Sequence, residues 1–268
     1  MDYAGELICM KKVRSFLNKI FVHYTFFTNR TLLKGKRIWW RDDDSFDLNN
    51  KFLNLLKFKK NNKMLNVYLS VIPGKLKNDF IRKVNEIEKL YVLPHGYLHK
   101  NYSNSDTYLN EYPDNRDAVE ISEEMYNVLR IMRTSFPDKF LPIFVPPWEH
   151  FSDKIIPILK KNKINFVSMS GDKNVGGKLK CVNCDINFHG YINYREGQYQ
   201  VIHKSLITLC NEIISIIKAS KNNNLIGFMT HHMDMNDEDW SNYEFILKML
   251  HNYGCEPSNH KYFMEMID

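Results

Sequence analysis

Residues 37–45 read RIWWRDDDS, an apolar segment that ends in three consecutive aspartates. A short apolar run with two tryptophans is typical of a buried β-strand. Three carboxylates at the end of such a strand repel one another, and burial penalises their charged forms. A bound divalent cation would relieve both effects, whereas an exposed turn that caps the next helix would avoid them. The segment therefore predicts a buried strand and raises metal binding as a hypothesis, with an Asp-rich turn as the alternative.

From residue 37 onward, short apolar runs alternate with longer amphipathic segments. We predict seven strands, over residues 37–43, 64–71, 90–95, 140–146, 164–170, 181–187 and 225–231. Apolar residues at three- and four-residue spacing predict helices at roughly 47–60, 76–89, 115–135, 152–162, 201–219 and 236–252. Ser152 and Asn236 are the predicted N-caps of the helices that they begin. Strands that alternate with helices indicate a parallel sheet, so the predicted fold class is α/β.

The first 36 residues fall outside this alternation, and we predict a helical extension that packs on the body. No internal repeat and no linker rich in proline, glycine or serine divides residues 37–268, which we predict to form one domain. The N-terminal segment carries acidic residues before basic ones and is not typical of a signal peptide. No apolar run approaches the roughly 18 residues of a membrane span. We therefore expect a cytoplasmic protein without a membrane span.

The charge balance, 37 basic against 31 acidic residues, gives a formal net charge of +6. The lysines are scattered among asparagines, which favours a solvated surface over a nucleic-acid interface, although a mild attraction to anionic substrates or membrane surfaces stays open. The five cysteines form no regular disulfide framework, which indicates a reducing compartment. Cys181 and Cys184 form one CxxC without the second pair that a four-cysteine zinc site needs. We interpret them as ordinary thiols.

Unusual polar residues follow the predicted strands, at the edge where parallel sheets and barrels build active sites. They are Arg41 to Asp44 after IWW, His95 after YVLP, Pro146 to His150 after PIFV, Asp185 within VNCDIN, and His231 and His232 after LIGFM. On its own, the pair His95 and His99 does not distinguish a metal site from two ordinary histidines. One aspartate with two histidines supplies three ligands and leaves open positions, which suits Zn²⁺ or another first-row ion. A second aspartate could then deprotonate water, and a further histidine could protonate a leaving group.

The ordered motifs RDDDS, HGYLH, FVPPWEH, CDINFHG and FMTHH resemble those of the polysaccharide deacetylase superfamily, the carbohydrate esterase family 4-like proteins. WWRDDD, LPHGYLHKNY, LPIFVPPW and IGFMTHHMDMNDEDW look like a subgroup associated with bacterial surface-polysaccharide biosynthesis. The resemblance spans about residues 37–253. It implies a distorted (β/α)7 barrel and a metal-dependent hydrolase that removes an N-acetyl group from a sugar or polysaccharide, in O-antigen or capsule (lipopolysaccharide) biosynthesis.

Carried over to this chain, the resemblance implies that Asp43 is the catalytic base and Asp44 a metal ligand. His95 and His99 would be the other two ligands of a divalent metal ion, most simply zinc, with cobalt, nickel, manganese and iron as alternatives. The three consecutive aspartates leave the register open by one, so Asp42 and Asp43 are the alternative pair.

His231 resembles the general acid of the last motif, with His232 as its rival. Pro147 and Trp148 match the motif that forms one wall of the substrate groove. The arginine that often begins this motif is absent here, because Phe144 and Val145 stand in its place. Arg41 could instead orient the base, with a surface salt bridge as the alternative.

Asp185 matches loosely the carboxylate that tunes the acid histidine, with a loop cap as the alternative. Tyr97, Trp148 and Trp240 are candidates for stacking against a sugar ring, with core or rim packing as the alternative. The expected partner is an N-acylated sugar, polysaccharide or nucleotide-sugar. Two other functions stay open: a catalytically inactive barrel that binds a glycan or nucleotide-sugar, and a deacylase of another small amide.

Overall fold

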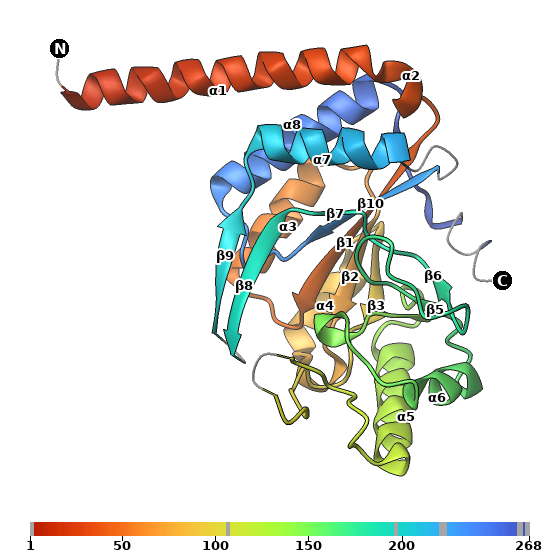
Figure 1. Ribbon diagram of the computed structural model, residues 1–268. Helices are drawn as coiled ribbons and strands as arrows, with labels where there is room; N and C mark the ends of the chain where they lie inside the picture. Colours follow the sequence, from red (N-terminus) through yellow and green to blue (C-terminus); the bar gives the residue numbers. More distant parts are fainter. Residues whose placement is uncertain (1–2, 106–107, 196–197, 220–223, 262–264, 266–268) are drawn as a thin grey trace.

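The computed structural model describes residues 3–105, 108–195, 198–219, 224–261 and 265. A parallel sheet at the centre of the molecule has the strand order β3-β2-β1-β10-β7, with β11 paired to the start of β1 (Figure 1). These strands are β1 (Arg37–Ser45), β2 (Val67–Val71), β3 (Leu90–Pro94), β7 (Ile186–Asn187), β10 (Leu225–Thr230) and β11 (Glu256–Pro257).

A second parallel sheet completes the ring of strands. It contains β4 (Ile143–Phe144), β5 (Phe166–Val167) and β6 (Lys180–Cys181). Bridges from Val92 to Phe140 and from His95 to Val145 join β3 to the β4 segment. Residues 180–187 pair with β5 through β6 and with β10 through β7, so one segment closes the ring. All seven predicted strand segments lie in this ring, and the predicted α/β barrel with a distorted, seven-membered ring is confirmed.

The side chains of the strands alternate between two hydrophobic clusters, as expected for a backbone with a period of two. One cluster fills the ring, and it draws on each part of the ring: Trp39, Tyr68, Leu93, Ile143, Phe166, Val182 and Met229. The other cluster lies between the strands and the helices and includes Trp40, Val67 and Phe228. The inside of the ring is therefore a packed core and not an open channel.

All six predicted helices are present. They are α3 (Asn50–Asn61), α4 (Asn78–Glu86), α5 (Ala118–Ser135), α6 (Ile155–Lys161), α7 (Leu206–Ala219) and α8 (Asp237–Asn252), with two short 3-10 turns, η1 (Pro73–Lys75) and η2 (Pro147–Glu149). Asn236 is confirmed as an N-cap, because its side chain accepts from the Asp239 amide at 2.9 Å. The Ser152 prediction is wrong in position, because Ser152 accepts from the Lys154 amide in the turn before α6.

An antiparallel hairpin, β8 (His189–Arg195) and β9 (Gln198–His203), forms in a region where the sequence analysis predicted no element before residue 201 and a helix from residue 201 onward. The predicted helix over residues 201–219 is wrong at its start, since Val201 and Ile202 pair with β8 and α7 begins only at Leu206. These β-branched residues fit a strand and also the apolar spacing of a helix, which explains the error.

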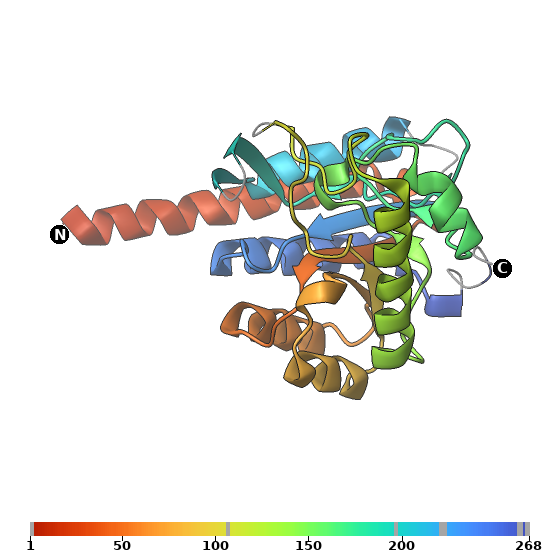
Figure 2. The same ribbon diagram turned by 90° about the horizontal axis from the view of Figure 1, so that it is seen from below.

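The N-terminal extension is helical, with α1 (Tyr3–Thr28) and α2 (Arg30–Leu33), while residues 1–2 lie outside the described residues. Its C-terminal half packs on α7 and α8 through Val22 and Phe26, which are fully buried. The N-terminal half projects beyond the body in both views (Figures 1 and 2). In the described part of the chain, no helix combines the length and apolar character that crossing a bilayer requires.

Candidate metal centre

The polar side chains at the end of strand β1 point in three directions. Arg41 and Asp43 follow Trp39 at every second position and point into the ring, whereas Asp42 follows Trp40 toward the helix layer. The pairing of β1 with β2 then shifts register between Asp42 and Ser45, and Asp44 has a φ of 64°. This bulge interrupts the alternation and brings Asp44 to the open end of the ring.

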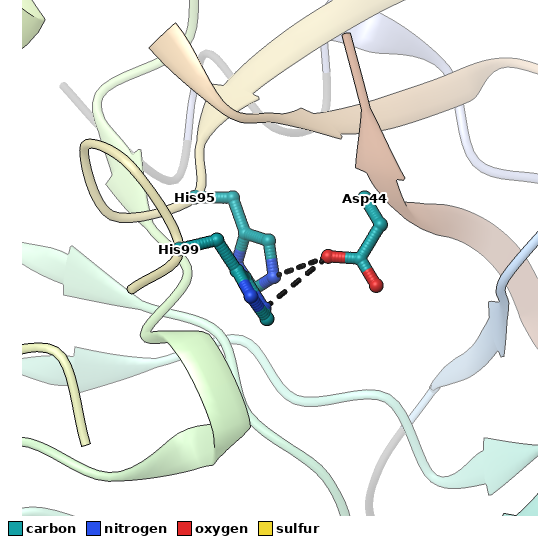
Figure 3. Close-up of side chains that lie close together, drawn as sticks. All are labelled: Asp44, His95 and His99. Carbon is teal, nitrogen blue, oxygen red and sulfur yellow. Dashed lines mark ion pairs between the residues drawn. The ribbon is translucent and has the colours of Figure 1, made fainter. Parts of the chain in front are cut away.

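Asp44 meets the two histidines of the YVLPHGYLH segment at that open end. Its Oδ1 lies 3.2 Å from His95 Nε2 and 3.3 Å from His99 Nε2 (Figure 3). His95 directly follows β3, and Gly96, with a φ of 62°, turns the chain so that His99 returns to the same point. His99 itself has a φ of 51°. Left-handed backbone at non-glycine residues costs free energy and clusters at functional sites.

The donor set fits a divalent cation. The Nδ1 of His95 lies 3.0 Å from the Val145 carbonyl, so Nδ1 carries the proton and the Nε2 lone pair faces Asp44. Asp44 Oδ1 is buried, and among the described residues it has no hydrogen-bond partner of good geometry, although two imidazoles converge on it. Two imidazole nitrogens and one carboxylate oxygen at this separation suit a first-row divalent ion.

The electrostatics of the three residues agree with ligation. Burial opposes the charged form of Asp44, but the imidazoles of His99 and His95 hold its pKa well below the usual range. Burial lowers the pKa of His99 to about 4, against the attraction of Asp44. Burial also disfavours charge on His95, yet the contact with Asp44 raises its pKa in the metal-free protein. At neutral pH a cation would therefore meet an ionised carboxylate and at least one neutral imidazole.

Asp43 is held by Arg41 in a two-point contact. Arg41 Nε lies 2.8 Å from Asp43 Oδ1, and Nη2 lies 2.9 Å from Oδ2. Arg41 also donates from Nη1 to Ser168 Oγ at 2.6 Å, and only 1% of its surface is exposed. Burial alone would lower the pKa of this guanidinium, but the contact with Asp43 raises it, so the guanidinium stays charged. The predicted alternative, a surface salt bridge, is excluded by this burial.

Asp42 and His232 pair with each other outside the cavity. Asp42 Oδ1 lies 2.6 Å from His232 Nδ1, and Oδ2 accepts from the Thr230 hydroxyl at 2.5 Å. Both residues are buried, and the His232 ring packs against Phe52 of α3. The His232 side chain therefore does not reach the cavity. Both of its predicted roles, as the rival acid and as a substrate contact, need that access. The alternative register with Asp42 as a functional carboxylate fails for the same reason.

His231 lines the cavity together with Asp43, Asp44, His95 and His99. Its Nδ1 is buried and without a hydrogen-bond partner among the described residues, and its ring meets that of Tyr191 edge-on at 5.2 Å. Adjacent positions at the end of β10 thus place one histidine in the cavity and the next in the core.

The cavity measures about 310 Å³, at the lower end of the range for small-molecule sites. Trp148 forms part of its wall, with its ring 4.2 Å from that of His99. Further lining side chains had no individual role predicted from the sequence: Leu109, Glu149, His150, Ser170, Asn187, Tyr191, Tyr199 and Asp234. Glu149 and His150 belong to the motif FVPPWEH and Asn187 to CDINFHG, whereas the hairpin residues come from no quoted motif. The hydroxyls of Tyr191 and Tyr199 donate to Asp234 at 3.0 and 3.3 Å, which ties the hairpin to the turn between β10 and α8.

Four residues that were predicted to contact the substrate do not line this cavity in the described part of the chain. Pro147 is buried beside Gly96, and Tyr97 packs against the core. Asp185 accepts from the Gly227 amide at 2.7 Å, which is the loop-cap alternative. Trp240 packs on Phe58 in the helix layer. Their side chains serve the fold around the site.

Glu111 holds the loop between His95 and His99 in place, and the sequence analysis missed this residue. Its carboxylate accepts from the Leu98 amide at 2.7 Å and from the Tyr97 amide at 3.2 Å. A side chain at position 96 would meet Glu111 at 1.8 Å, so the glycine there is required for the approach. Burial raises the pKa of Glu111 to about 7, against those backbone hydrogen bonds. No motif in the sequence marks this residue, because its role depends on tertiary contact.

A second cluster of the same composition ties the hairpin to α8. Asp239 Oδ2 lies 3.2 Å from His189 Nε2 and 2.8 Å from His203 Nδ1. The remaining nitrogen of His189 is buried and faces no partner among the described residues, in contrast to His95 with its carbonyl. Metal-bound histidines usually donate from the second nitrogen. We therefore interpret this cluster as a structural hydrogen-bond network.

The fold is that of the carbohydrate esterase family 4 domains. A family 4 acetyl xylan esterase from Clostridium thermocellum, solved with a cobalt ion, is 11% identical, with a TM-score of 0.54 over 87% of this chain and 94% of that one. A peptidoglycan N-acetylglucosamine deacetylase is 12% identical, with a TM-score of 0.53 over 84% and 86%.

A family 4 pseudoenzyme from Bacillus anthracis is also similar, with 13% identity and a TM-score of 0.51 over 87% of this chain and 66% of that one. No protein-family profile and no curated protein matches the sequence. At these identities the comparisons establish the fold, and the function has to be argued from the site.

Proposed function

We propose that this protein is a metal-dependent deacetylase that removes an N-acetyl group from a sugar or polysaccharide. The observation that carries the proposal is the convergence of Asp44, His95 and His99 beside an arginine-clamped Asp43. Structural zinc sites close with four protein ligands, whereas catalytic sites have three and leave a position open. Three ligands at a cavity mouth favour the catalytic kind.

A divalent cation held there, zinc in our proposal, would polarise an acyl carbonyl and make water more acidic. Asp43 takes a proton from the attacking water, and Arg41 holds its carboxylate in one orientation while that happens. His231 lines the same cavity and donates a proton to the departing amine. Each of these three residues thus has one defined task in amide hydrolysis.

The substrate class follows from the wall of the cavity and from the proteins with this fold. Trp148, Tyr191 and Tyr199 offer flat apolar faces with polar groups beside them, which suits a sugar ring. The names of two structural neighbours refer to acetyl xylan and to peptidoglycan N-acetylglucosamine. We extend this to acylated surface polysaccharides or their nucleotide-sugar precursors, processed in the cytoplasm.

A catalytically inactive, glycan-binding barrel is the second candidate. One protein with this fold is a pseudoenzyme. In this chain, Phe144 and Val145 occupy the place of the arginine that often orients the base. The contact between Arg41 and Asp43 argues against this candidate, because it supplies that orientation from β1.

The experiment is acetate release from N-acetylglucosamine oligomers and from a nucleotide-linked N-acetylhexosamine. We expect release by zinc- or cobalt-loaded protein and none by chelator-treated protein. Asp43→Asn should bind the metal and lose activity by about 100-fold or more. Asp138→Asn, at an exposed position, is the matched control and should be unchanged. Sugar binding without acetate release by the metal-loaded wild type would favour the inactive barrel instead.

A further inference from the structure

Helix α1 carries an apolar stripe that the fold does not cover. The stripe follows spacings of three and four residues, and flanking phenylalanines widen it; its members are Met10, Val13, Phe16, Leu17, Ile20, Phe21, Tyr24 and Phe27. Each is at least 44% exposed, and Met10, Phe16 and Tyr24 reach 64% or more. Contiguous apolar surface of this extent marks an interaction site.

The stripe lies opposite the face that packs on the body. Val22 and Phe26 are fully buried against the α7 and α8 layer, and helical geometry places them across the axis from Val13, Ile20 and Tyr24. The folding of the body therefore accounts for one face of α1 and leaves the other without a structural role. The stripe also shares no residue with the catalytic cavity.

The charges beside the stripe identify its partner. Glu6 is the one acidic residue of α1, and no aspartate or glutamate follows it before Asp42. The basic residues of the helix are Lys11, Lys12, Arg14 and Lys19. At 3.6 residues per turn, Lys12 and Lys19 lie on one flank of the stripe and Arg14 on the other. Aliphatic stems of this length can bury along apolar surface while the charged ends reach polar groups.

We propose that α1 lies in the interface of a lipid bilayer that contains anionic lipids, with this stripe among the acyl chains. An apolar, aromatic-rich face flanked by lysine and arginine is typical of interfacial helices. Pairing of α1 with a second copy would instead bring these cations together, with Glu6 as the one acidic residue of the helix to compensate. The projection of α1 beyond the body leaves its N-terminal half free to lie on a surface (Figures 1 and 2).

The experiment is flotation of the full chain with vesicles. We expect binding to vesicles of phosphatidylcholine with phosphatidylglycerol, weaker binding at high salt, and little binding to phosphatidylcholine alone. Replacement of Lys12, Arg14 and Lys19 by glutamine should weaken binding by roughly 100-fold. Phe16→Ser, Leu17→Ser and Ile20→Ser together should abolish it without changing the thermal melt of the body.

Val119→Ser with Tyr126→Ser is the matched control, because both are about as exposed on α5 as the stripe residues are on α1. This control should float like the wild type. A wild-type chain that does not bind the anionic vesicles would overturn the proposal. So would a lipid-free dimer that the three stripe substitutions convert to a monomer, since that result would assign the stripe to a second copy.

Discussion

Two adjacent histidines at the end of β10 differ in environment and should differ in the effect of mutation. His232 pairs with buried Asp42, so His232→Ala leaves a buried carboxylate short of a partner and should reduce the free energy of unfolding by about 1–3 kcal/mol. His231 has no such partner and faces the cavity, so His231→Ala should leave stability nearly unchanged and reduce deacetylation by about 100-fold.

Urea denaturation and acetate release on the two variants check this contrast. Equal loss of stability in both variants would contradict the assignment of one histidine to the core and the other to the cavity.

Arg41 acts through Asp43 and does not line the cavity. Arg41→Lys keeps a positive charge but cannot make the two-point contact. We expect kcat to fall by about 10- to 100-fold with KM and metal content nearly unchanged. Steady-state kinetics on the zinc-loaded variant measure this. A change confined to KM would show that Arg41 serves substrate binding and not the orientation of the base.

Glu111, which holds the loop between His95 and His99, should make the stability of the fold depend on pH. Burial raises its folded pKa from an ordinary value of 4.5 to about 7. Between these values the folded protein holds a proton that the unfolded chain has released, so the free energy of unfolding contributed by Glu111 falls as pH rises. This stabilising contribution is fully present below pH 4.5 and is lost as the pH rises through about 7.

Glu111→Gln should remove that part of the pH slope in the metal-free protein. Denaturant melts of wild type and variant at several pH values between 4.5 and 7 check this. Identical slopes in the two proteins would mean that Glu111 is ionised throughout the range.

At the scale of the element, strand β1 shows what sequence alone could supply. Period-two alternation assigns Arg41 and Asp43 to one face and Asp42 to the other, as the structure shows. Alternation would also send Asp44 with Asp42 into the helix layer. The bulge with positive φ at Asp44 reverses this, and no glycine marks it in the sequence. The choice of Asp44 as the candidate ligand came from the resemblance and not from the pattern.

The β8–β9 hairpin was missed, together with the cavity residues it supplies. Its sequence, HGYINYREGQYQVIH, is rich in aromatic and β-branched residues on both sides of a glycine, which is a hairpin signal. The signal was weaker than the helical spacing that continues into α7. Tyr191 and Tyr199 therefore had no predicted role, although both reach the cavity.

The hairpin should act on substrate binding. Tyr191→Phe and Tyr199→Phe each remove one hydrogen bond to Asp234, and we expect KM to rise by about threefold to tenfold with metal content unchanged. Tyr126→Phe, on an exposed face of α5, is the control. A fall in kcat without a change in KM would contradict a role confined to binding.

At the scale of the whole molecule, the order of strands and helices was predictable because every part of the ring repeats the same pattern. The closure of the ring was predicted from the family resemblance and not from the pattern of apolar residues. It depends on residues 180–187 pairing with β5 at one end and with β10 at the other, and such pairing depends on tertiary geometry. The packing of α1 on α7 and α8 is tertiary in the same sense, although its helical character was evident.

The central claim is that one divalent cation binds at Asp44, His95 and His99. Elemental analysis of zinc-loaded, dialysed protein tests it most directly. We expect one equivalent per chain in the wild type, in Asp43→Asn and in His203→Ala, and far less in His95→Ala and His99→Ala. His203→Ala is the matched control, since it alters the second histidine and aspartate cluster. A full equivalent in His95→Ala and His99→Ala, or its loss in His203→Ala alone, would contradict the account.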